Sequence, residues 1–169
     1  MSGIYIHIPF CKRLCWFCAC RTQGTQSDKP IAAYLETLLS EIEVLGRSLP
    51  RGVTLSRMHW GGGTPTLLTP FMMQTLSGAV AAILPFSPEA EFSVEIDPNE
   101  IDQARVDAMA AAGMTRASIG VQDFDANIQA TIGRIQSFDI TRDAALMLRD
   151  AGVQSLNADI LFGLPHQTP

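Results

Sequence analysis

The 169-residue chain is 47% hydrophobic and 17% charged, and its formal net charge is −5. These values are typical of a globular protein of one domain, and the acidic balance excludes a general nucleic-acid binder, which would carry a basic patch. No apolar run is long enough to cross a bilayer and no signal peptide opens the chain. We therefore expect a cytoplasmic monomer that binds neither membranes nor nucleic acid.

The first strand is predicted at residues 4–8, a run of β-branched and aromatic residues that Pro9 ends. From about Pro30, apolar residues recur at helical spacing. This pattern predicts an amphipathic helix that Gly46 and Pro50 close.

The second strand and helix have clear boundaries. Residues 53–60 predict a strand that runs directly into the glycines at 61–63. Thr69 is suited to cap a helix and Pro70 to occupy its first position. This helix is predicted to reach Leu84.

The second half of the chain repeats the same alternation. Residues 92–96 predict a third strand, and the helix after it ends near Gly113, a glycine suited to a left-handed cap. Residues 117–121 predict a fourth strand, followed by a helix that ends at Gly152. Residues 153–162 predict a fifth strand. Strands that alternate with helices predict a parallel sheet.

Polar and cysteine residues lie at or just beyond the carboxyl ends of these strands. They are the cysteines at 11–20, residues 61–64, Glu95 with Asp97, Gln122 with Asp123, and Asp159. Barrel-type enzymes place their active sites at this end of every strand, whereas a doubly wound sheet concentrates ligand contacts at one switch point. The predicted fold class is therefore α/β, as a full or partial (β/α) barrel of parallel strands.

All four cysteines fall between Cys11 and Cys20, which indicates metal binding rather than a disulfide scaffold. Structural zinc sites usually have a second cysteine or histidine pair farther along the chain, and none follows here. Cys20 could complete a four-thiolate cluster only through a tight chelate. Cys11, Cys15 and Cys18 alone would leave one iron free for a small molecule that offers an amine and a carboxylate.

The CxxxCxxC loop after the first strand resembles that of the radical SAM enzymes, which use S-adenosylmethionine (SAM). Six blocks together resemble the oxygen-independent coproporphyrinogen III oxidases over essentially the whole chain. They are YIHIPFC from residue 5, CAC from 18, HWGGGTPT from 59, EIDP from 95, GVQDF from 120 and GLP from 163. A sister group of haem-chaperone-like proteins shares most blocks but generally lacks the cysteine that Cys20 matches, so Cys20 favours the oxidases.

The resemblance implies a 4Fe-4S cluster held by Cys11, Cys15 and Cys18, with its free iron chelated by SAM. Other cofactor-binding residues follow from the resemblance or from their position. Gly62, Gly63, Thr64 and Glu95 are expected at SAM, and Tyr5 and Phe17 against an adenine or the cluster. Gln122, Arg134 and Asp159 match positions around a second SAM molecule.

Several of these residues also have ordinary structural readings. The glycine run suits a tight turn, Cys20 a small buried thiol, Arg134 a solvated surface charge and Asp97 a helix cap. Tyr5 and Phe17 could be simple packing residues. His7 and His59 are assigned no catalytic role.

The implied reaction is the oxidative decarboxylation of coproporphyrinogen III to protoporphyrinogen IX, driven by a radical made from SAM and an unidentified electron donor. Lys12, Arg13 and Arg21 are candidates to meet the carboxylates of that porphyrinogen substrate. The alternative function is haem binding and transfer. Because family members have further chain at both ends, we expect residues 1–169 to be an incomplete radical SAM core domain. The partial barrel would be truncated after the fifth strand and would lack the last barrel strand and the C-terminal domain.

Overall fold

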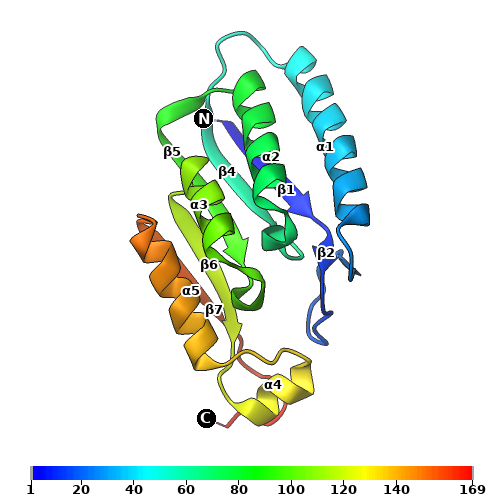
Figure 1. The fold of residues 1–169 in the computed structure, drawn as a ribbon, viewed down its shortest axis with the longest axis vertical. Coiled ribbons are helices and arrows are strands. Elements are labelled where there is room, and N and C mark those ends of the chain that lie inside the picture. The colour runs from blue at the N-terminus through cyan, green and yellow to red at the C-terminus, as the bar shows by residue number, and fades with distance from the viewer. Residues whose placement is uncertain (1, 169) are drawn as a thin grey trace.

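The computed structural model describes residues 2–168 and contains a five-stranded parallel sheet (Figure 1). Its strands are β1 (Ser2–Ile8), β4 (Leu55–Gly62), β5 (Phe86–Ile96), β6 (Arg116–Gln122) and β7 (Ser155–Ile160), and they neighbour one another in that order. Each strand lies beside the next one along the chain, with no reversal of order, as in a (β/α) barrel. The predicted α/β class with parallel strands is confirmed.

Helices α1 (Lys29–Ser48), α2 (Pro70–Ile83), α3 (Gln103–Ala111) and α5 (Phe138–Asp150) cover one face of the sheet (Figure 1). The short helix α4 (Ala126–Ile132) lies at the carboxyl ends of the strands and was not predicted. Two 3-10 turns, η1 (Pro65–Leu67) and η2 (Pro98–Glu100), follow β4 and β5. The two-residue strands β2 (Phe10–Cys11) and β3 (Gln23–Gly24) pair in parallel and were also missed. Among helices in residues 2–168, none is both long and apolar enough to traverse a membrane.

The two faces of the sheet differ completely in chemistry. The face toward the helices is apolar and buried, and at its centre Trp60 and Phe92 meet edge to face with ring centroids 5.0 Å apart. Along each strand, the residues that alternate with the buried ones form the opposite face of the sheet, here called the polar face. Its members in register across the strands include Tyr5 and His7, His59, Ser93 and Glu95, Ser118, and Asn157 with Asp159. The alternation of each strand therefore separates the core from a hydrogen-bonding surface.

Predicted and observed boundaries agree within two residues except at the start of β5. Helix α1 ends at Ser48, between Gly46 and Pro50, and Gly46 lies against α2, where a Cβ would lie 2.6 Å from Cγ2 of Ile83. Strand β5 begins at Phe86 rather than at residue 92. Pro88 and the acidic residues after it masked the first half of this strand in the sequence.

The predicted helix caps are present. Oγ1 of Thr69 accepts a hydrogen bond from the Met72 N–H at 3.2 Å, with Pro70 at the first position of α2. Gly113 follows α3 with φ +88°.

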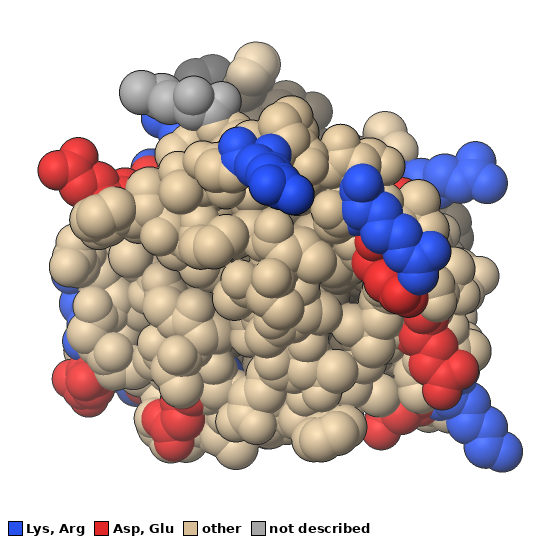
Figure 2. Space-filling model, turned by 90° about the horizontal axis from the view of Figure 1, so that it is seen from above, with Lys and Arg blue, Asp and Glu red and all other residues tan. Residues whose placement is uncertain are grey.

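The end of the molecule opposite to the carboxyl ends of the strands carries charged side chains of both signs around its periphery (Figure 2).

Candidate functional site

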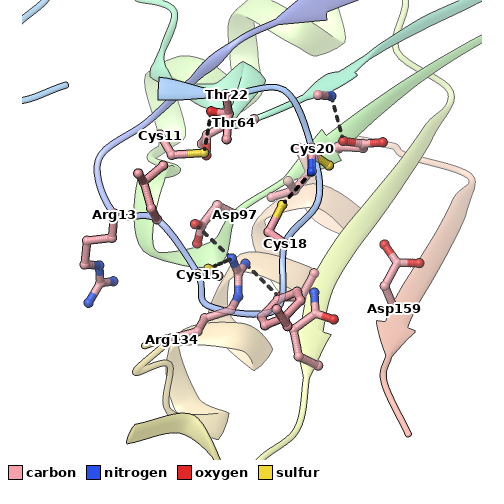
Figure 3. A pocket seen from close by; sticks show the side chains of 18 of the residues that line it. Cys11, Arg13, Cys15, Cys18, Cys20, Thr22, Thr64, Asp97, Arg134 and Asp159 are labelled. Atoms are coloured by element: carbon pink, nitrogen blue, oxygen red, sulfur yellow. Dashed lines mark hydrogen bonds and ion pairs between the residues drawn. The ribbon is translucent and has the colours of Figure 1, made fainter. Parts of the chain in front are cut away.

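A cavity of about 650 Å³ opens at the carboxyl ends of the strands (Figure 3). The segment at residues 11–22, here called the cysteine loop, forms one wall, and the ends of β4, β5, β6 and β7 form the others. Of the predicted site residues, the cavity lining includes Cys11, Cys15, Cys18, Phe17, Gly62, Gly63, Thr64, Glu95, Gln122, Arg134 and Asp159. The sheet thus brings together eleven of the twelve predicted residues, and Tyr5 is the one that lies outside the lining.

Backbone hydrogen bonds fix the cysteine loop at its base and at its middle. The Gln23 N–H donates to the Pro9 carbonyl at 2.9 Å and closes the base. At the middle, the Trp16 N–H donates to the carbonyl of Ile132, at the end of α4, at 3.0 Å. These two hydrogen bonds position the loop from two sides.

The sulfur of Cys11 accepts hydrogen bonds from two threonine hydroxyls. Oγ1 of Thr22 lies 3.3 Å from this sulfur, and Oγ1 of Thr64 lies 3.5 Å from it. Thr64 is buried. Hydroxyls in these positions can donate hydrogen bonds to a sulfur that ligates a metal.

The sulfurs of the other two predicted ligands, Cys15 and Cys18, also lie near hydrogen-bond donors. Nη1 of Arg134 lies 3.7 Å from the Cys15 sulfur, and the Cys20 N–H donates to the Cys18 sulfur at 3.4 Å. Every sulfur of the predicted ligand set thus faces at least one hydrogen-bond donor. Three sulfurs with such partners around one cavity fit an iron-sulfur cluster, whose properties depend on these hydrogen bonds.

The arrangement does not resemble a structural zinc site. Within the part of the chain that the structure describes, no three His, Cys, Asp or Glu side chains are placed to hold a single metal ion. Structural zinc needs four ligands around one centre. In a cubane cluster each thiolate instead binds a different iron, so the ligands stand farther apart than those of a single metal ion.

Cys20 is exposed and lines the cavity, so its reading as a small buried thiol is wrong. The hydrogen bond with the Cys18 side chain, together with partial burial, raises the pKa of Cys20 to about 11. Cys20 is therefore a neutral thiol at neutral pH.

The glycine run brings the exit of β4 against the cysteine loop. Gly62 has φ +110°, and a Cβ there would lie 2.6 Å from the His7 ring. At Gly63 a Cβ would lie 2.5 Å from the carbonyl oxygen of Phe10, while the Gly63 N–H donates to the Ile8 carbonyl at 2.8 Å. These glycines make a turn, and they also leave bare backbone at the cavity wall.

Glu95 connects the polar face to this turn. Its Oε2 accepts a hydrogen bond from the Gly62 N–H at 3.0 Å, and its Oε1 lies 3.2 Å from Nε2 of His59. Nδ1 of His59 lies 2.6 Å from Oγ of Ser93. The carboxylate at the cavity wall is therefore held by two groups of the neighbouring strand β4.

Tyr5 lies beside the cavity rather than in its lining. Its hydroxyl is 2.9 Å from Nδ1 of His7, whose Nε2 is 2.8 Å from the Arg21 carbonyl oxygen. A carbonyl oxygen only accepts, so Nε2 of His7 carries a hydrogen. Partial burial, and secondarily the charge of Glu95, raise the pKa of Tyr5.

Arg134 is enclosed rather than solvated, so its reading as a surface charge is wrong. Its side chain is 13% exposed, Nη2 donates to the Gly120 carbonyl at 3.0 Å, and Nη1 lies 3.5 Å from Oδ2 of Asp97. Asp97 also caps η2 through the Asn99 N–H, at 3.0 Å, so its predicted capping role is confirmed.

The neighbours of Arg134 in the cavity carry their own constraints. Gln122 has φ +68° where the pairing of β6 with β7 shifts register, a conformation uncommon outside glycine. Oδ2 of Asp159 accepts from Ser118 Oγ at 2.8 Å, and its Oδ1 accepts from Asn157 Nδ2 at 2.7 Å. Such conformational constraint is typical of binding sites.

The three cationic residues expected to meet the substrate carboxylates lie in different surroundings. Lys12 forms an ion pair with Glu100, at 2.5 Å. Arg13 contributes to the lining, but its side chain extends away from the cysteine sulfurs (Figure 3). Arg21 is exposed and contributes its backbone carbonyl to His7.

Sequence reasoning missed several lining residues, among them Trp16, Thr22, Ser118 and Gly120. Ser118 and Gly120 alternate with the buried residues of β6, so strand periodicity could have found them. Thr22 lies in an irregular loop without periodicity, and nothing in the sequence marked it.

Comparison with known proteins agrees with this geometry. The family model of the radical SAM superfamily matches residues 5–169. The chain belongs to the radical SAM superfamily. Membership in this family implies a 4Fe-4S cluster and SAM as cofactors, and the cavity fits both.

The chain is also similar to several individual proteins. It is 64% identical over 167 residues to the oxygen-independent coproporphyrinogen III oxidase of Paracoccus denitrificans, and 35% identical to a protein of the same name in Helicobacter pylori. The solved structure of coproporphyrinogen III oxidase (HemN) from Escherichia coli matches with a TM-score of 0.93 and 38% identity over 99% of this chain. The chain spans 37% of the Paracoccus protein, 36% of the Helicobacter protein and 38% of the Escherichia coli chain.

Proposed function

We propose that this chain is the cluster-binding and SAM-binding core of an oxygen-independent coproporphyrinogen III oxidase. The observation that carries the proposal is the set of three cysteine sulfurs, each beside a hydrogen-bond donor, around one cavity. When bound, the reduced cluster supplies the electron that cleaves SAM into methionine and the 5'-deoxyadenosyl radical that attacks a substrate propionate. The similarity to proteins with the oxidase name supports the choice of substrate.

In this proposal the cysteine loop and the turn after β4 hold SAM between them. The backbone at Gly62 and Gly63 can approach a ligand closely because no side chain intervenes. Glu95 holds the turn through Gly62 and presents an acceptor for a ribose hydroxyl or an ammonium group. Phe17 offers an apolar contact from the cysteine loop.

We extend the proposal to a second SAM molecule at Gln122, Arg134 and Asp159. These three residues line the same cavity and offer an amide, a guanidinium and a carboxylate. A guanidinium suits the methionine carboxylate of SAM, and a carboxylate suits its ribose hydroxyls. Tyr5, outside the lining, would support the site through His7.

The proposed substrate is a tetracarboxylate porphyrinogen, for which Arg13 and Arg21 remain the cationic candidates. The reaction needs an electron donor, which is not identified. We propose that the protein works in the cytoplasm as a monomer.

The first test is anaerobic reconstitution with iron and sulfide, followed by metal analysis and EPR of the reduced protein with and without SAM. The proposal predicts about four irons per chain and a signal that SAM alters. Cys15→Ala should lose the cluster, whereas Cys20→Ala, the matched control, should keep it. Zinc, or no metal in the wild-type protein, would refute the cluster assignment.

The second test concerns the substrate. The reconstituted protein is incubated with coproporphyrinogen III, SAM and a reductant, and the oxidised products are measured by porphyrin fluorescence. Formation of protoporphyrin supports the oxidase function. Stoichiometric haem binding without turnover would instead indicate a haem-transfer protein.

A further inference from the structure

Two buried glutamines lie behind the wall of the cavity without lining it. Gln129 in α4 is 6% exposed, and Gln136, before α5, is 1% exposed. Burying an amide is costly unless its polar atoms find partners. Their partners therefore indicate what the pair is for.

The two glutamines bind each other and the surrounding backbone. The Gln136 N–H donates to Oε1 of Gln129 at 2.9 Å. In return, Nε2 of Gln129 donates to the carbonyls of Gln136 at 2.6 Å and of Asp123 at 2.8 Å. One side chain thus fastens the segment after α4 to the end of β6.

The Gln136 side chain extends this connection to the cavity wall. Its Nε2 donates to the Gly120 carbonyl at 3.1 Å and to Oγ1 of Thr141 at 3.0 Å. The Gly120 carbonyl is also the acceptor for Nη2 of Arg134. One backbone oxygen at the end of β6 therefore receives both the buried amide and the guanidinium of the cavity.

This shared acceptor fixes where the Arg134 guanidinium points. The Arg134 backbone N–H donates to the main-chain carbonyl of Gln129 at 2.9 Å, which anchors the Arg134 backbone. Close packing limits its side chain as well, since a Cβ on Gly120 would lie 3.1 Å from both Arg134 Nη2 and Gln122 Nε2. With these constraints, Nη1 of Arg134 faces Cys15 and Asp97.

We propose that Gln129 and Gln136 are positioning residues for SAM binding, an inference that rests on the proposed SAM role of Arg134. They do not touch the cofactor. The Gln129 side chain holds residue 136, and the Gln136 side chain bonds the Gly120 carbonyl that Arg134 also bonds, so the guanidinium is oriented before SAM arrives. Hydrogen bonds in such a buried network are strengthened by the low local dielectric.

The test compares the affinity of the reconstituted protein for radiolabelled SAM, measured by equilibrium dialysis, in wild type, Gln136→Met and Gln129→Met. Methionine has a similar shape and no amide. We expect the Kd for SAM to rise about tenfold in each variant, roughly the effect of one lost hydrogen bond. Gln136→Asn, an amide too short to reach Gly120, is a further variant in case a methionine variant does not fold.

Two controls separate positioning from general loss of stability. Val80→Ala removes buried apolar contacts in α2, away from the cavity, and should lower stability without changing the SAM Kd. Thr141→Val removes one partner of Gln136 but leaves its bond to Gly120, so SAM affinity should stay near that of wild type.

Hydrogen exchange of the cofactor-free protein gives an independent readout. The backbone N–H of Gln136 should be protected from exchange in wild type. It should exchange faster in Gln129→Met, which lacks the Oε1 that accepts its hydrogen bond. Glutamine variants that bind SAM as wild type does would overturn this inference alone. Wild-type protein that holds a cluster yet binds no SAM would overturn the proposed function and this inference together.

Discussion

Single residues at the cavity wall are constrained by how closely backbone segments approach one another. Gly63 is the tightest case, because a Cβ there would contact the Phe10 and Ile8 carbonyls and the Thr22 hydroxyl. Two of these contacts are backbone, which cannot move away as a flexible side chain can. The glycine is therefore required by the lack of space for a side chain.

Gly63→Ala should destabilise the fold by about 1–3 kcal/mol, the usual cost of overpacking, and should weaken cluster retention. Gly78→Ala in α2 is the matched control. A Cβ at Gly78 meets nothing within 4 Å, so alanine should stabilise this helix by roughly 0.5–1 kcal/mol. Urea unfolding of both variants measures the difference, and equal effects would contradict the steric argument.

Glu95 makes a second prediction at this scale. Glu95→Ala removes the acceptor of the Gly62 N–H and should raise the Kd for SAM by about tenfold or more. Glu95→Gln keeps an acceptor oxygen and should lose less. Equilibrium dialysis with SAM distinguishes them, and an alanine variant with wild-type affinity would remove Glu95 from the site.

The sequence marked residues whose chemistry is specific, such as the cysteines, the glycine run and Glu95. It could not mark Thr22, which matters only because the loop folds back onto Cys11. The positive φ of Gln122 could not be predicted from the sequence either, because it depends on the register shift between β6 and β7.

Among the elements, those with regular periodicity were predicted closely, apart from the first half of β5, and the short ones were missed. The strands and the four covering helices follow alternating or helical apolar patterns. Helix α4 has seven residues, and β2 and β3 have two each, too few to establish a period. Their positions are set by tertiary contacts such as the Trp16 to Ile132 hydrogen bond.

The cap of α2 is testable as an element. Thr69→Ala removes the acceptor for the Met72 N–H and should lower stability by about 1 kcal/mol. Thr69→Ser keeps a hydroxyl and should recover most of the loss. Thermal unfolding of the two variants measures this, and identical midpoints would show that the cap contributes nothing.

The junction of β6 with α4 should respond to acid. Hydrogen bonds from the Gln167 side chain and the Asp125 N–H lower the pKa of Asp123. A lowered folded-state pKa stabilises the protein above the unfolded value, near pH 4, and the contribution disappears as pH falls through the folded pKa. Asp123→Asn should therefore be less stable than wild type at pH 7, with the gap closing as the pH falls through the lowered pKa of Asp123. A gap in melting temperature that does not change with pH would contradict this account.

Across the whole molecule, the sheet has an apolar face under the helices and a polar face that ends in the cavity. Ligand binding at that cavity should stabilise the entire fold by mass action. At 100 times its Kd, SAM should add about 2.7 kcal/mol to the reconstituted protein, or about 5–11 °C in Tm. Calorimetric scans with and without SAM measure the shift. The cluster-free Cys15→Ala variant should show little or none.

The strict alternation of the two faces also determines which changes in chain length the protein tolerates. Adding one residue within β5, before Val94, would turn Glu95 toward the helices and expose its apolar neighbours to the cavity. Adding one residue in the connection between α1 and β4 would leave every strand in phase. Length variation is therefore expected in the connections, while the interiors of the strands keep a fixed count of residues.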